Sequence, residues 1–181
     1  NINFLEKNFD FIGSISPVSF DVKKSNSFNI GDLSLDSSNL SDRLKLSLNK
    51  LHANSRVFSV FKKNIFNDFK YIDNDFLGFD YLFILHAIRK GKFKKISDGS
   101  VTLSKNGSSN QMEIFKNNRN NIYEFFFPFH RLLVNALYLY KHEKFMLKYI
   151  LIFRINLFNF NSLILRLKWL LLKIIRGNES N

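Results

Sequence analysis

The chain has 181 residues, the length of one domain or of one domain with extensions. Its 27 basic and 15 acidic residues give a net charge of +12, and 45% of its residues are hydrophobic, so it can bury a core and also face a polyanion. It contains no cysteine, which excludes disulfide bonds and thiolate metal sites.

The first 40 residues predict an extended N-terminal arm. Short apolar alternations around Gly13 and Pro17 are typical of one or two short strands, or of a chain that lies over a neighbouring subunit. The stretch that follows is rich in Ser and Asn and is typical of a loop.

Three helical patterns come next along the chain. Leu44, Leu48 and Leu51 share one helical face, and Ser41 is expected to be the N-cap of that helix. Apolar residues recur at helical spacing through residues 57–72, which indicates an amphipathic helix or a core segment. Residues 76–90 predict a buried helix that ends before Gly91.

Two glycine turns, Asp98-Gly99 and Asn106-Gly107, divide the segment after these helices into three short pieces. Each dipeptide favours a hairpin because its glycine takes a positive φ at little cost. We therefore predict a three-stranded antiparallel meander at about residues 92–116, which is small enough to need a helix packed against it.

The residues from 123 to 177 form a long apolar and basic tail that we predict to be helical. Pro128 is expected near the start of a helix. Three asparagines within residues 156–161 predict a break between two helices. The second helix would be capped by Ser162 and closed by Gly177.

Together these elements predict an α+β fold, with helices around a small antiparallel β-meander, a long basic helical C-terminal tail and an extended N-terminal arm. The chain would divide into the arm at residues 1–40, a small α+β domain at 41–122, the tail at 123–177 and a disordered end at 178–181.

The tail is not expected to span a membrane. Its longest uncharged run, residues 155–165, has eleven residues and includes three asparagines, whereas a spanning helix needs about 20 apolar residues. A basic side chain at the centre of a span also costs about 2.5–3.5 kcal/mol. Burial of the tail against protein, RNA or a membrane surface stays open.

The positive charge lies in the second half of the chain. Residues 1–80 hold ten acidic and ten basic residues, whereas residues 81–181 hold five acidic and seventeen basic residues. This asymmetry predicts a region that faces nucleic acid, with an anionic lipid surface or a plain solvated surface as the alternatives. The candidate RNA-binding residues are Arg89, Lys90, Lys92, Lys94, Lys95, Arg119, Arg131, Lys141, Lys144 and Lys148.

No catalytic motif accompanies this charge. The four histidines, at positions 52, 86, 130 and 142, have no metal-ligand spacing with a carboxylate, and the sequence has no glycine-rich phosphate loop. We therefore expect no enzyme activity, no metal, no cofactor and no small-molecule substrate.

The composition carries a resemblance of its own. Phe occurs 22 times while Gly occurs seven times and Pro twice, a bias typical of A/T-rich genomes. With the basic second half and the basic tail, this composition resembles that of ribosomal proteins encoded by A/T-rich mitochondrial genomes. Residues 82–107 are also similar to the small RNA-binding module of the S4 family of ribosomal proteins, where a helix leads through a basic turn into short strands.

The resemblance implies a structural constituent of the mitochondrial ribosome, located in the mitochondrion. Its partners would be ribosomal RNA, recognised through shape and backbone, and neighbouring ribosomal proteins. The apolar tail keeps an alternative open, an accessory subunit of an inner-membrane respiratory or ATP synthase complex. A nuclease or maturase fragment would need a carboxylate cluster beside the basic residues, and the sequence shows none.

Overall fold

The computed structural model describes residues 1–20, 33–49, 54–69, 76–103 and 122–178. The predicted third strand of the meander and Arg119 lie outside the described residues. The helices are α1 (Ile2–Lys7), α2 (Leu40–Ser47), the 3₁₀ helix η2 (Ser55–Phe58), α3 (Asn64–Asp68), α4 (Phe79–Lys90), α6 (Ile122–Phe126), α7 (His130–Leu139) and α8 (Phe145–Asn178). The strands are β1 (Phe11–Ile15), β2 (Val18–Phe20), β3 (Val60–Phe61), β4 (Lys92–Lys95) and β5 (Val101–Leu103).

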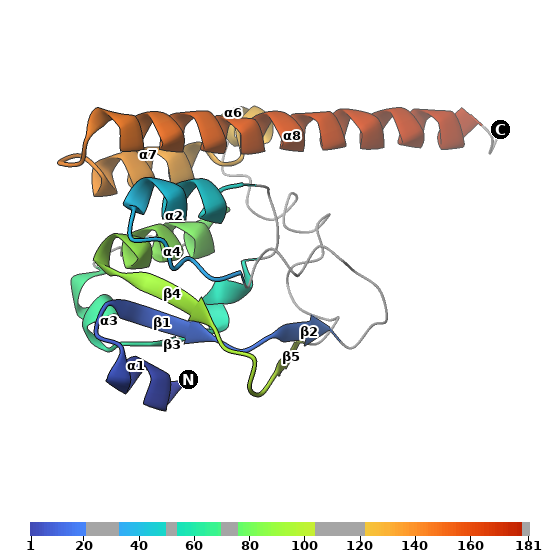
Figure 1. Ribbon diagram of the computed structural model, residues 1–181. Helices are drawn as coiled ribbons and strands as arrows, with labels where there is room; N and C mark the ends of the chain where they lie inside the picture. The colour runs from blue at the N-terminus through green and yellow to red at the C-terminus, as the bar shows by residue number, and fades with distance from the viewer. Residues whose placement is uncertain (21–32, 50–53, 70–75, 104–121, 179–181) are drawn as a thin grey trace.

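The fold mixes helices with a small sheet, as the sequence predicts, and the helices are stacked on one side of that sheet (Figure 1). The helix α4 packs against β1, α2 and α7, and α8 forms the outermost layer over α2 and α7. The helix α1 lies on the opposite side of the sheet (Figure 1). The predicted division of the chain at residues 40, 122 and 177 stays a prediction.

The predicted antiparallel meander is wrong for the described residues. The strand β1 lies at the centre of a three-stranded sheet, antiparallel to β3 and parallel to β4. The strand β5 pairs in parallel with β2 and does not follow β4 in a hairpin. A parallel pair needs a long crossover, and the helices between β1 and β4 supply it. Period-two alternation predicts a strand but does not identify its partner.

The N-terminal arm is therefore corrected as well, because its first residues include the central strand of the sheet. Gly13 is opposite Phe61 on one neighbouring strand and Phe93 on the other. The two phenylalanine rings meet edge to face with their centroids 5.6 Å apart. A Cβ atom at position 13 would lie 2.8 Å from Cδ1 of Phe93, so the close approach of the rings requires glycine.

The predicted helices have mixed outcomes. The buried helix of residues 76–90 is confirmed as α4, and Gly91 follows it. The helix α2 is confirmed, but its N-cap is Asn39, whose Oδ1 accepts from the Ser41 amide at 2.8 Å. The helical pattern of residues 57–72 is wrong as a single helix, because η2, β3 and α3 divide its described part.

The tail is helical as expected, but α8 is continuous and the predicted break at residues 156–161 is wrong. The exposed Asn156 donates to the Ile152 carbonyl one turn back, at 2.9 Å, and so stays within the helix. The buried Asn159 accepts from the Phe129 amide at 2.8 Å and ties the segment before α7 to α8. Ser162 is buried inside α8 and does not begin a helix.

Replacing Asn159 with Ala should lower the free energy of unfolding by about 1–3 kcal/mol, because it leaves the buried Phe129 amide without an acceptor. Urea unfolding followed by circular dichroism measures this change. The matched control is Asn161→Ala at an exposed position of the same helix, with an expected change within about 0.5 kcal/mol. Equal effects of the two substitutions would contradict the assigned role of Asn159.

Asp80, in the first turn of α4, should make stability depend on pH. Burial raises the pKa of this carboxyl to about 6 from its ordinary value of 3.8. Since the folded-state pKa is the higher one, the contribution of this carboxyl to stability is greatest at low pH and falls as pH rises from about 4 through about 6. Asp80→Asn should then raise the free energy of unfolding by about 1–3 kcal/mol at neutral pH and flatten this dependence.

The control for Asp80 is Asp42→Asn, which changes the same residue type in the first turn of α2. The Asp42 side chain is 54% exposed, so its replacement should destabilise by less than about 1 kcal/mol. Urea unfolding at about pH 4.5 and about pH 7 compares both variants with the unmodified chain. A loss of stability in Asp80→Asn at neutral pH would refute the assignment.

Candidate nucleic-acid interface

The predicted RNA-binding residues that the structure describes fall into three groups. The first group lies at the end of α4 and along β4, the second lies in the turn between α7 and α8 and at the start of α8, and Arg131 stands alone near the start of α7. In chain order these residues are Arg89, Lys90, Lys92, Lys94, Lys95, Arg131, Lys141, Lys144 and Lys148.

An ion pair joins the first two groups. Arg89 Nε lies 3.3 Å from Glu143 Oε1, and the guanidinium stands 5.4 Å from the centroid of the Tyr140 ring. The Tyr140 hydroxyl donates to the Leu85 carbonyl at 2.8 Å, and burial raises the pKa of this phenol well above its usual value. The end of α4 is therefore fastened to the turn between α7 and α8.

These contacts place cations from two distant segments at one end of the molecule, on the left of Figure 1. We call this set the basic end. It consists of Arg89, Lys90, Lys92, Lys141, Lys144 and Lys148. Arg131 lies at the opposite end of α7, where its guanidinium stands 5.4 Å from the Phe76 ring centroid, and it does not join this set.

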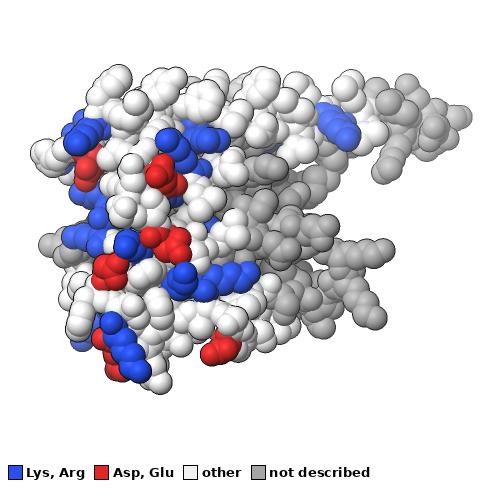
Figure 2. Space-filling view, in the orientation of Figure 1, with Lys and Arg blue, Asp and Glu red and all other residues white. Residues whose placement is uncertain are grey.

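Acidic side chains form ion pairs with two lysines of the predicted interface. Lys92 Nζ lies 2.7 Å from Asp10 Oδ2, and Lys94 Nζ lies 2.9 Å from Asp36 Oδ2. The hydrogen bond from Lys92 lowers the pKa of the Asp10 carboxyl. On the visible face, Lys and Arg alternate with Asp and Glu and do not form one uninterrupted patch (Figure 2).

Other contacts fix the second group. Lys141 Nζ stands 4.5 Å from the Tyr138 ring centroid. Lys148 Nζ donates to the Lys141 carbonyl at 2.7 Å and so closes the turn between the two helices. Lys141 and Lys148 are therefore preorganised, since their positions depend on contacts within the protein.

Sequence reasoning missed the acids that accompany these cations. Asp10 and Asp36 lie in the segment predicted as an arm, and Glu143 lies between the candidate RNA-binding residues Lys141 and Lys144. The signal that could have identified Asp10 and Asp36 is the equal number of acids and bases in residues 1–80. Because the sequence does not reveal which strands pair, that number does not show which lysines form ion pairs with these acids.

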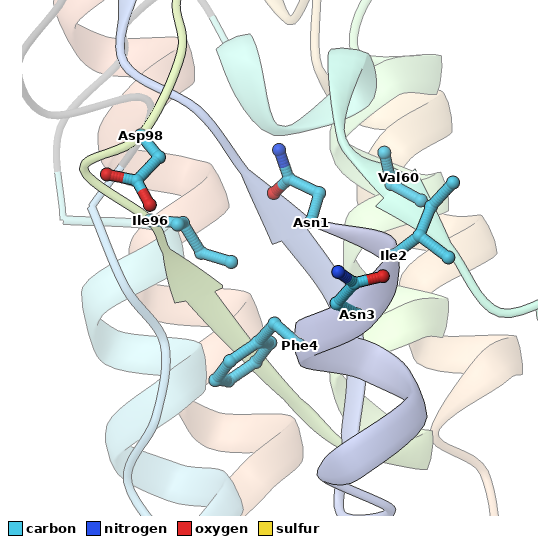
Figure 3. Close-up of a pocket in the computed structure, with 7 residues that line it drawn as sticks. All are labelled: Asn1, Ile2, Asn3, Phe4, Val60, Ile96 and Asp98. Carbon is cyan, nitrogen blue, oxygen red and sulfur yellow. The ribbon is translucent and has the colours of Figure 1, made fainter.

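A hollow of about 540 Å³ lies beside α1 and opens to solvent (Figure 3). Its lining consists of Asn1, Ile2, Asn3 and Phe4, of Ile96 and Asp98 after β4, and of Val60, which lies beside Ile2 in the close-up. Asp98 is the one acidic side chain among these lining residues, so the hollow offers no acid–base pair. Within the described part of the chain, no three His, Cys, Asp or Glu side chains come close enough to hold a metal ion.

One described helix is long and apolar enough to cross a membrane, by length and composition. It covers Phe145–Lys168 within α8, with a mean hydropathy of 1.4, and 33% of its most apolar window is buried. Its buried side chains, among them Leu151, Ile155 and Phe158, lie in the same core as α2, α4 and α7.

Comparison with known proteins assigns no family to this fold or to the basic end. No protein-family model, no curated protein and no solved structure matches the chain.

Replacing Lys92 with Met should raise the pKa of the Asp10 carboxyl toward its ordinary value, because the hydrogen bond from Lys92 is the main cause of its depression. Carboxyl titration of Asp10 by nuclear magnetic resonance measures this shift. Lys95→Met, three residues further along β4, is the matched control and should leave the Asp10 pKa unchanged. A shift of equal size in both variants would show that Lys92 does not pair with Asp10 in solution.

Proposed function

We propose that this protein is a non-catalytic structural constituent of the mitochondrial ribosome, and that its basic end faces ribosomal RNA. The observation that carries the proposal is the basic end itself. Two cationic segments about fifty residues apart are joined by the Arg89–Glu143 pair and by the Tyr140 hydroxyl on the Leu85 carbonyl. Cations that are held in place bind phosphates at a lower entropic cost than cations on mobile chains.

The arrangement suits the backbone of RNA more than its bases. Lysine ammonium groups act as point charges that contact phosphates, and such contacts position a protein without reading sequence. The acids Asp10 and Glu143 reduce the local charge, and so the basic end would contribute a limited number of phosphate contacts. Most of the recognition would then come from the shape of the RNA and from neighbouring proteins.

The later part of α8 supports a place within a larger assembly. Leu151, Phe158, Leu165 and Leu172 succeed one another every seven residues and therefore share roughly one helical face. The first two are 0% and 1% exposed, whereas the last two are 53% and 43% exposed. Burying a leucine fully is worth about 1.5–3 kcal/mol, so a neighbouring protein that covered this face would gain from it.

The alternative is an accessory subunit of an inner-membrane respiratory or ATP synthase complex. The length and hydropathy of Phe145–Lys168 favour it. The buried face of the same segment opposes a spanning arrangement, because α2 and α7 pack there and α2 carries the exposed Asp42 and Lys45. We therefore rank it second.

The RNA proposal predicts a specific loss of affinity. Lys90→Ala combined with Lys144→Ala should weaken binding to mitochondrial ribosomal RNA about tenfold at low salt and reduce the salt slope by about two. Lys7→Ala combined with Lys63→Ala is the control, since both side chains are exposed and Lys7 ends α1 on the other side of the sheet. Filter binding over a salt series measures both. Equal losses in the two pairs would indicate non-specific attraction and contradict the proposed interface.

The assembly is tested by fractionation of mitochondria that hold a tagged copy of the chain. We expect the chain to sediment with ribosomal particles in a density gradient and to move when the subunits are dissociated. Sedimentation with respiratory membranes after a salt wash would overturn the ribosomal proposal in favour of the alternative.

A further inference from the structure

The helix α8 presents an exposed apolar surface as well as a buried one. Opposite its packed face lies a row of apolar side chains, which is interrupted by the exposed Asn156 and which we call the α8 stripe. Each of these apolar side chains is at least 40% exposed. The spacing of three, four and seven residues places them on one side of the helix. The stripe consists of Phe145, Tyr149, Ile152, Phe153, Phe160, Ile164 and Leu167.

The middle of the stripe is hollowed into a shallow groove of about 350 Å³. The rings of Tyr149 and Phe153 stack along it with their centroids 6.4 Å apart, and Phe160 lies at its end. Asn156, also in the lining, directs its Nδ2 to the Ile152 carbonyl. The groove therefore offers apolar contact and few polar groups, which suits hydrocarbon better than a phosphate backbone.

Positive charge flanks this apolar surface. The described part of α8 contains no acidic residue, and its described basic side chains are Lys148, Arg154, Lys168 and the buried Arg166. Each residue advances an α-helix by about 100°. On this spacing, Lys148 and Lys168 project on opposite sides of the α8 stripe, each about 100° from its midline. A helix with an aromatic and aliphatic face between two cationic flanks complements a membrane interface, where acyl chains lie beneath anionic headgroups.

We propose that α8 docks this protein on an anionic membrane surface and lies parallel to it, with the α8 stripe inserted at the level of the headgroups. A spanning arrangement would place α2 and α7 in hydrocarbon, because they cover the opposite face of α8. A parallel arrangement leaves that packing intact and inserts the exposed side chains alone. This inference does not rest on the RNA proposal, since none of the apolar residues of the stripe belongs to the basic end and Lys148 is the one residue that the basic end shares with a cationic flank.

Vesicle sedimentation of the purified full chain tests the proposal. Vesicles of phosphatidylcholine with one-quarter phosphatidylglycerol should bind the chain, and vesicles of phosphatidylcholine alone should bind it about tenfold less. High salt should weaken the binding, because it screens the cationic flanks. Failure to bind the anionic vesicles, or equal binding to both kinds, would overturn the proposal.

The stripe is tested by Phe153→Glu combined with Phe160→Glu, which should reduce binding to anionic vesicles about tenfold or more. The control pair is Phe9→Glu combined with Phe66→Glu, which adds the same charge at exposed phenylalanines outside α8. Circular dichroism checks that both pairs fold. Equal losses in the two pairs would show that net charge alone drives binding and would overturn the role of the stripe.

A labelling experiment removes any dependence on variants that lose their fold. Because the chain has no cysteine, Asn156→Cys accepts a single environment-sensitive fluorophore in the middle of the stripe. Its emission should shift to the blue on anionic vesicles, whereas the same label at Phe9→Cys should not shift. A shift at both positions or at neither would contradict the proposed orientation. If a ribosomal RNA fragment shifts the Asn156→Cys label and vesicles do not, the stripe binds RNA and the membrane proposal fails.

Discussion

The burial of α4 on nearly every side is the constraint on which the rest of the fold depends. Seven of its residues are buried, and they include three consecutive turns of aliphatic side chains such as Leu82, Leu85 and Ile88. A helix that is apolar all round needs neighbours on all faces, and here β1, α2, α3, η2 and α7 supply them. The arrangement of the sheet below α4 and of the helices above it (Figure 1) follows from the need to cover α4 on these faces.

The same burial creates a problem at the end of α4, where carbonyl groups lack helical partners. The buried Arg43 from α2 donates Nε and Nη2 to the Ile88 carbonyl at 3.2 and 2.9 Å. The Tyr140 hydroxyl, at the end of α7, donates to the Leu85 carbonyl, which lies more than one turn before the last residue of α4 and is therefore not one of these terminal groups. Two helices are therefore drawn to this end of α4. The gathering of cations at the basic end is a consequence of these contacts, because α7 leads directly into the turn that carries Lys141 and Lys144.

The local sequence pattern was sufficient to predict secondary structure where the residues of one segment determine it alone. The composition of α4 and the stop at Gly91 predicted a buried helix, and the apolar tail predicted α7 and α8.

The sequence pattern failed where a residue's contact partner lies far away in the sequence. No residue near Asn159 in the sequence shows that its side-chain oxygen accepts from the Phe129 amide. The asparagines inside α8 therefore predicted a break between two helices. The alternation around Gly13 likewise could not show that Phe61 and Phe93 would meet over it. The candidate cations were identifiable by charge, but the acids that pair with them were not.

Charge pairing also changes how the two halves of the chain should be compared. The neutral first half is not electrostatically separate, since Asp10 and Asp36 neutralise lysines of β4. The unbalanced charge therefore shifts from the sheet toward the helical layers. There Lys144 is followed at once by Phe145, the 79% exposed first residue of the α8 stripe. The basic end and the stripe thus adjoin at the turn between α7 and α8. A polyanion bound at the basic end would sit at the tip of α8, while the side of the helix stays open to a second, apolar neighbour.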